Sequence, residues 1–118
     1  MSDAPRLRTA VADILAALGL PPADARIVAE DLVAADLEGV GSHGVMLVPM
    51  YVERILADSV SNKTEPTVIH DGGSAMVLDA GNILGQLSSD WAIPMVIERA
   101  REHGLACIAV KNGFHFGT

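Results

Sequence analysis

The sequence has 118 residues, half of them hydrophobic, and its net charge is −7. This length suits one domain of ordinary size, and the apolar content is enough for a packed core, which excludes a disordered chain. The negative charge argues against nucleic acid or an anionic membrane surface as a partner, and no apolar run approaches the roughly 20 residues of a membrane span.

The first part of the chain predicts two helices joined by a short break. Apolar residues recur at helical spacing over residues 8–18, and Gly19 follows as a C-terminal cap. A second helix is expected from Pro22 or Ala23 to about Glu38, because proline is favoured at the first helical position, where its missing N–H has no intrahelical partner.

A third helix is expected after the glycine break at residues 39–41. Ser42 is a suitable N-cap, so this helix should run from His43 or Gly44 to about Ala57, with Pro49 in its second turn. The chain then becomes polar from Asp58 to Glu65, which is typical of a linker. We therefore predict an N-terminal helical region over residues 1–60 and a second region over residues 61–118.

The second region is predicted to fold in the order β-β-α-β. Short β-prone runs at 67–70 and 75–79 flank the sequence Asp71-Gly72-Gly73-Ser74, which is typical of a hairpin. A helix is expected over 86–102, capped by Gly104, and the apolar run 105–110 favours a buried central strand. The fold class is accordingly α/β.

The single cysteine and the four histidines give few signs of disulfide or metal chemistry. Cys107 has no partner for an internal disulfide, which fits a reducing cytoplasm, and its apolar neighbours predict a buried structural thiol. The histidines are far apart in the sequence and show no zinc-type spacing, so we expect no metal site.

Two histidine- and glycine-containing motifs are the candidates for chemistry. The first is Gly41-Ser42-His43-Gly44. If Ser42 caps a helix, His43 lies at its positive end, where a substrate carboxylate or keto oxygen could exchange a proton with the imidazole. The alternative is that Ser42 is only a cap and His43 a solvated surface residue, just as the acidic residues Asp31 and Asp36 are expected to form a solvated face.

The second motif is Asn112-Gly113-Phe114-His115-Phe116-Gly117. It follows the last predicted strand, and ligands of α/β sheets tend to bind at the carboxyl ends of strands. The two phenylalanines could shield a cofactor ring or a reacting carbonyl from water. The alternative is a packed loop whose histidine bonds to the backbone.

Taken together and in order, these residues resemble the type-2 malate/L-lactate dehydrogenase family. The resemblance rests on residues 36–45, then on Pro49, Tyr51-Val52 and Arg54, and continues through Asp71-Gly72, Gly85-Gln86 and the helix end at 97–104 to Asn112 and His115-Phe116-Gly117. It covers essentially the whole chain.

The resemblance implies an oxidoreductase that uses NAD or NADP to interconvert 2-keto and 2-hydroxy acids. It implies a nucleotide-binding fold unlike the Rossmann fold, a homodimer, and His43 and His115 as candidate acid/base residues. Ser42 would bind substrate or nucleotide, and Phe116 and Gly117 the cofactor. Hydride would pass to the carbonyl carbon while a histidine supplies the proton.

Two features depart from the family pattern. Many members carry an arginine five residues after the motif serine, but this chain has Leu47, so Arg54 is the candidate for binding a substrate carboxylate. Members of the family also continue well beyond the second motif. We therefore expect an incomplete α/β domain without turnover by itself, with a non-catalytic interaction or subunit role as the alternative.

Overall fold

The computed structural model describes residues 3–115, and these form two compact units that meet at Lys63 and Thr64 in the sequence. The first unit is helical: α1 (Ala4–Ala17), α2 (Pro22–Leu37), two 3-10 turns, η1 (Gly41–His43) and η2 (Val45–Leu47), and α3 (Val48–Leu56). The second unit contains β1 (Thr67–Asp71), β2 (Ala75–Asp79), α4 (Gly85–His103) and β3 (Cys107–Lys111).

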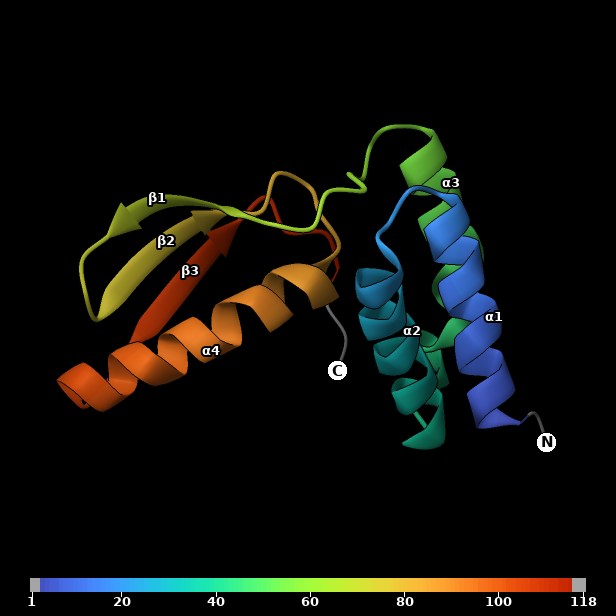
Figure 1. Ribbon diagram of the computed structural model, residues 1–118, viewed down its shortest axis with the longest axis horizontal. Coiled ribbons are helices and arrows are strands. Elements are labelled where there is room, and N and C mark those ends of the chain that lie inside the picture. Colours follow the sequence, from blue (N-terminus) through green and yellow to red (C-terminus); the bar gives the residue numbers. More distant parts are fainter. Residues whose placement is uncertain (1–2, 116–118) are drawn as a thin grey trace. The chain divides into compact units, whose positions relative to one another are not determined.

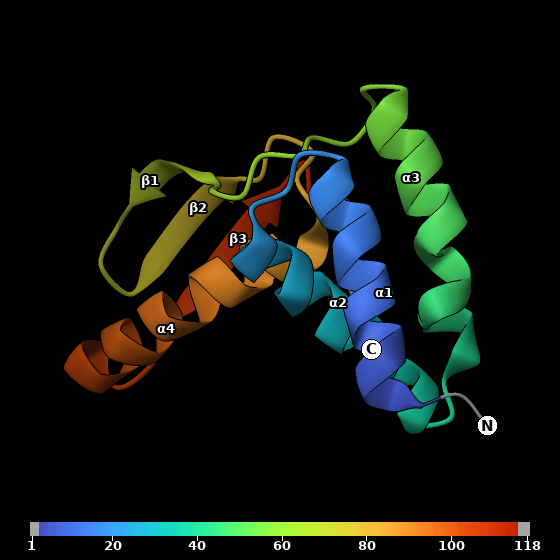
Figure 2. The same ribbon diagram turned by 45° about the vertical axis from the view of Figure 1, so that its right-hand side comes forward.

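The helical unit is held together by side chains from all three helices. α1 and α2 lie side by side and run in opposite directions, and α3 lies alongside α1 (Figures 1 and 2). Leu15 from α1, Leu32 from α2 and Tyr51 from α3 are fully buried. Burial of each such side chain contributes about 1.5–3 kcal/mol, so mutual packing rather than local propensity stabilises these short helices.

Two of the predicted helix boundaries differ from the structure. α1 begins a full turn earlier than residue 8, because Pro5 occupies its first turn and the N–H of Leu7 donates to the carbonyl of Asp3. The third helix begins only at Val48, so Pro49 lies in its first turn, where proline needs no intrahelical partner. The predicted span of the second helix is confirmed.

The α/β unit is a three-stranded sheet in the order β1-β2-β3 with α4 packed on one face (Figure 1). β1 and β2 are antiparallel, and α4 carries the chain back so that β3 pairs parallel with β2. Met76, Leu78 and Ala92 form the buried cluster between sheet and helix, with Trp91 and Ile108 packed against it. The predicted β-β-α-β order is confirmed.

The last strand is not the buried central strand that its apolar sequence predicts. Within the described residues β2 is central and β3 lies at one edge, with most of its residues exposed. Cys107 is likewise an exposed free thiol rather than a buried one. The hydrophobicity of residues 105–110 predicts burial, but it does not determine whether the strand lies at the centre or the edge of the sheet, or what covers it.

The hairpin between β1 and β2 is held by a residue of α4. The Asp71 carboxylate accepts from the N–H of Gly73, and Arg99 binds the same carboxylate through two nitrogens at 2.6 and 2.8 Å while donating to the carbonyl of Gly73. The Arg99 guanidinium, followed by the Gly73 N–H, lowers the pKa of Asp71. This bidentate pair fixes the end of the sheet that lies away from the second motif.

Candidate functional site

The first motif lies in two consecutive 3-10 turns that follow the end of α2. Ser42 and His43 belong to η1, which makes no side-chain capping bond, and Gly44 separates η1 from η2. The expectation that Ser42 caps an α-helix is therefore wrong, and so is the helix-dipole argument that rested on it. Pro49 limits how early α3 begins, and the turns before it are too tight for an α-helical ladder.

Ser42 and His43 form a hydrogen-bonded pair. The Ser42 hydroxyl lies 2.9 Å from Nδ1 of His43, with Ser42 exposed and His43 half-buried. When the hydroxyl donates to Nδ1, the neutral imidazole carries its proton on Nε2, and the bond also limits rotation of the ring. The hydrogen bond with Ser42 therefore orients the imidazole of His43.

Asp36 is exposed, as predicted for a solvated face, and its carboxylate is also bonded to the chain beyond the motif. Oδ2 of Asp36 accepts a hydrogen bond of 2.9 Å from the backbone N–H of Val45. A Cβ atom added at Gly44 would overlap this carboxylate. Asp36 is thus a residue of the site that sequence reasoning missed. One feature of the sequence could have indicated this role. Asp36 lies in the last turn of a predicted helix, where the negative end of the helix dipole disfavours a carboxylate.

The second motif begins where the parallel strands end. The pairing of β2 with β3 continues into the loops, as the N–H groups of Ala80 and Asn82 donate to the carbonyls of Lys111 and Asn112 at 2.9 Å. Gly85 then donates to the carbonyl of Phe114 at 2.7 Å. The loop that carries His115 is therefore attached along its length to the segment leading into α4, at the predicted end of the strands.

His115 itself adopts a backbone conformation that side chains rarely take, with φ at +31°. Such a conformation costs a non-glycine residue about 1–3 kcal/mol and is more common at functional sites than elsewhere. The ring of Phe114 lies beside the imidazole, with 6.3 Å between ring centroids. Phe116 and Gly117, the predicted cofactor-binding residues, lie outside the described residues.

Asp79, at the end of β2, anchors the start of this second loop. Its Oδ1 accepts from the side-chain amide of Asn112 and from the backbone N–H of Gly81, both at 2.9 Å. These two donors, the Asn112 amide first, stabilise the charged carboxylate and lower the pKa of Asp79. Asn112 has φ at +54°, which asparagine tolerates better than most residues.

Arg54 occupies the last turn of α3, and its side chain is exposed. Its carbonyl accepts from the N–H and the hydroxyl of Ser59, which closes the end of the helix. Arg54 and the motif histidine His43 both belong to the helical unit, whereas His115 belongs to the α/β unit. Convergence of the two imidazoles on one carbonyl therefore stays a prediction.

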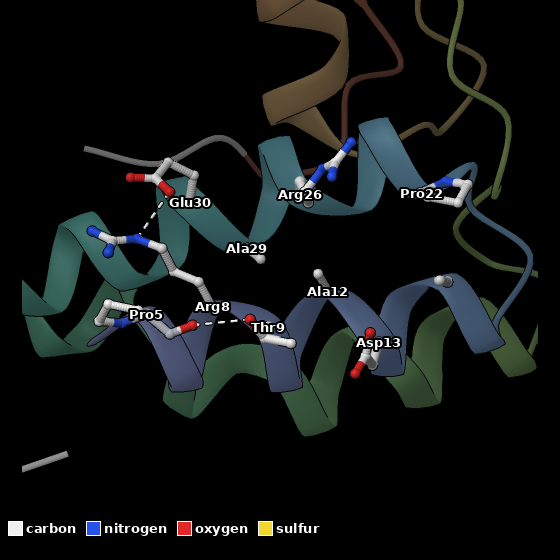
Figure 3. Close-up of a pocket in the computed structure, with 10 residues that line it drawn as sticks. Pro5, Arg8, Thr9, Ala12, Asp13, Pro22, Arg26, Ala29 and Glu30 are labelled. Atoms are coloured by element: carbon white, nitrogen blue, oxygen red, sulfur yellow. Dashed lines mark hydrogen bonds and ion pairs between the residues drawn. The ribbon is translucent and has the colours of Figure 1, made fainter. Parts of the chain in front are cut away.

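A cavity of about 450 Å³ lies between α1 and α2 of the helical unit (Figure 3). Arg8 reaches across it to Glu30, with 2.9 Å between Nε and Oε2, and Arg26 and Asp13 also line it. Neither Ser42 nor His43 is among its lining residues. This cavity is therefore separate from the first motif.

At the start of α4, three backbone N–H groups already donate to carbonyls of the chain. The N–H of Gly85 donates to Phe114, and those of Leu87 and Ser88 donate to the carbonyl of Leu84. These groups would otherwise face an anion at a helix N-terminus. Within residues 3–115, no group of three or more His, Cys, Asp or Glu side chains is placed to hold a metal ion, and no helix is long and apolar enough to cross a membrane.

Comparison with known proteins identifies the family. A family model described as malate/L-lactate dehydrogenase matches residues 2–118. The chain belongs to this family. It is 38% identical to malate dehydrogenase of Pyrococcus abyssi over 107 residues, which are 91% of this chain and 30% of that protein.

Solved structures of the family share the fold. Malate dehydrogenase of Pyrococcus horikoshii superimposes with a TM-score of 0.91 at 35% identity, over 97% of this chain and 33% of that one. Sulfolactate dehydrogenase of Methanocaldococcus jannaschii gives a TM-score of 0.92 at 29% identity, over 98% and 33%. The chain thus spans about a third of the length of these relatives and corresponds to their N-terminal portion.

Proposed function

We propose that this chain carries the acid–base part of a nicotinamide-dependent oxidoreductase for small 2-keto and 2-hydroxy acids. Family membership supports the class of reaction. The observation that carries the proposal is the 2.9 Å hydrogen bond between Ser42 and Nδ1 of His43, which prepares an imidazole to act as a proton donor.

In this proposal His43 acts through Nε2. Before the transfer both ring nitrogens of His43 carry a proton: Nδ1–H donates to the Ser42 hydroxyl oxygen, and the proton on Nε2 is passed to the keto oxygen as that oxygen gains charge, which leaves a neutral imidazole. The cofactor, NAD or NADP, supplies the hydride when bound. In the reverse direction the neutral imidazole accepts the hydroxyl proton. Ser42 is exposed and His43 is half-buried, so a bound cofactor or substrate could reach both side chains.

His115 is the second acid–base residue in this proposal. Its strained backbone and its position at the end of the parallel strands support a functional role. Phe116 and Gly117 are proposed to contact the cofactor on the strength of the family resemblance. We further propose that the helical region and the α/β region, residues 1–60 and 61–118, act as separate domains that bring His43 and His115 together.

The proposed substrate carries a carboxylate next to the reacting carbon. Relatives are named malate, L-lactate and L-sulfolactate dehydrogenases, and these substrates share that group. Leu47 cannot bind it, whereas the exposed guanidinium of Arg54 is suited to bidentate contact. We propose Arg54 as the substrate-binding cation.

We propose a homodimer in the cytoplasm as the working state of the enzyme. We also propose that the 118-residue chain has no turnover by itself, because the relatives that it matches are about three times as long. The alternative of a non-catalytic interaction role is not favoured, since the named relatives are dehydrogenases.

The test is a steady-state assay of the full gene product that contains these residues. Oxidation of NADH and of NADPH is followed with oxaloacetate, pyruvate and 3-sulfopyruvate. His43→Gln should lower kcat/KM by about 100-fold or more, because the proton donor is removed. His103→Gln is the matched control, since His103 is an exposed histidine at the end of α4, and it should stay within about twofold. A loss below tenfold in His43→Gln would contradict the role assigned to His43, and a loss below tenfold in His115→Gln would contradict the role assigned to His115.

A further inference from the structure

The segment that carries His43 contains no regular α-helix or strand, so its position depends on individual contacts. Local bonds close its turns: the N–H of His43 donates to Val40, and the N–H of Gly44 donates to Gly41. A contact of longer range ties it to α2, where the Asp36 carboxylate accepts from the N–H of Val45, nine residues along the chain. Asp36 thus links α2 to η2, the turn that follows His43 in the sequence.

The close approach of this carboxylate explains a glycine of the motif. Gly44 has φ at −98°, which any residue can adopt, so backbone freedom is not the reason for glycine here. A Cβ at this position would overlap the Asp36 carboxylate, and one at Gly41 would lie 3.8 Å from its Oδ1. Gly44 therefore provides room for Asp36 next to the backbone of His43.

The position of Asp36 is electrostatically unfavourable for the helix alone. It lies in the last turn of α2, where no basic residue is present and where the helix dipole disfavours a negative charge. The hydrogen bond from Val45 offsets this cost in the folded chain. A carboxylate placed against the preference of its helix is better explained by its contact with the motif turn.

We propose that Asp36 is a positioning residue for His43. Its carboxylate, packed against Gly44 and bonded to the N–H of Val45, fixes the turn from which the imidazole projects. Ser42 then orients the ring through the hydrogen bond at Nδ1. The importance of this arrangement rests on the proposed role of His43, but the arrangement itself is testable without turnover.

The experiment measures two local signals by NMR in the 118-residue chain: hydrogen exchange of the Val45 amide and the ring-nitrogen resonances of His43. Asp36→Ala should speed exchange at Val45 by about tenfold and shift the His43 ring resonances, because one charge-assisted bond is lost. Asp36→Asn has a side chain of the same length that still carries an acceptor oxygen. Both signals should therefore stay near their values in the original chain.

Glu38→Ala is the matched control. It removes one negative charge from the same end of α2, and Glu38 is exposed, with no side-chain bond to another residue within 3–115. It should leave both signals unchanged. Equal effects of Glu38→Ala and Asp36→Ala would overturn the proposal in favour of a general charge effect, and so would an Asp36→Ala chain whose two signals match the original.

If Asp36→Ala does not fold, Asp36→Glu takes its place. The longer side chain keeps the charge but brings an extra methylene toward Gly44, so the His43 signals should still shift. Unchanged signals would overturn the proposal. If only the dehydrogenase assignment is wrong, the Asp36 variants still change the two NMR signals as predicted, but His43→Gln has no effect on turnover.

Discussion

The two histidine loops are built in different ways, although each is anchored by an aspartate, Asp36 from the helix before the first loop and Asp79 from the strand beside β3. Asp36 reaches the first loop through the N–H of Val45, across a backbone of short 3-10 turns. Asp79 anchors the second loop through Asn112, and that loop is also attached by backbone bonds that continue the pairing of β2 with β3.

This difference shows that the same residue types can be fixed by side-chain packing or by a backbone ladder. A ladder distributes its energy over several bonds, so one substitution at the surface of the second loop removes little. The first loop depends on a close fit between a carboxylate and a glycine, which one added methyl group disturbs.

The largest effect is expected from Leu84→Ala, which weakens the support beneath the second loop. Leu84 is fully buried and pairs with Phe114 across the extended ladder. Loss of about 2–5 kcal/mol in unfolding free energy is expected. Chemical denaturation followed by fluorescence of Trp91, the single tryptophan, measures it. Leu105→Ala, at a side chain 79% exposed, should change the same quantity by less than about 0.5 kcal/mol; comparable losses at the two leucines would refute the account.

A smaller but more specific effect is expected when one methyl group is added to each loop. Gly44→Ala places a Cβ against Asp36 and should lower the unfolding free energy by about 1–3 kcal/mol. Denaturant unfolding followed by the NMR resonances of the Tyr51 ring measures this loss. Gly113→Ala places its Cβ in open space and should stay within about 0.5 kcal/mol. If the alanine at position 113 proved as costly as the one at position 44, the contrast between the loops would be wrong.

The smallest effect is a pH dependence contributed by Asp79. Its pKa lies below the usual 3.8 in the folded chain, because Asn112 and Gly81 donate to the carboxylate. A lowered folded pKa stabilises the fold above the usual value, and that contribution is lost as pH falls through the folded pKa. The stability difference between the original chain and Asp79→Asn should therefore be largest near neutrality and shrink below about pH 3.8.

Asn112→Gly provides the control for that titration. Glycine accepts the positive φ of this position but lacks the amide that bonds to Asp79. In the Asn112→Gly chain, the unfolding free energy should depend less on pH through Asp79 than it does in the original chain. Chemical denaturation from pH 2 to pH 7 measures this dependence. If Asn112→Gly left the pH dependence of stability unchanged, the lowered pKa of Asp79 would have a cause other than the Asn112 amide.

Much of the fold could be predicted because local signals agreed with one another. Pro22 and Gly39 mark the limits of α2, and the two glycines after Asp71 predict the hairpin. The errors arose where a local signal had two interpretations. Ser42 before a helix-like stretch suggested a cap, but Pro49 sets where α3 begins, and the run around Cys107 suggested burial although the strand lies at an edge.

By itself, the sequence determined the order of elements, the two histidine motifs and the family, because periodicity, turn residues and ordered motifs are properties of neighbouring positions. Only the tertiary structure decided that Asp36 lies against Gly44 and that Asp79 holds Asn112. These pairs are separated by 8 and 33 positions in the sequence, and their contact depends on how the chain turns between them. The physical reason is that a hydrogen bond has a range of about 3 Å, so its partners are defined by the fold and not by the residue types.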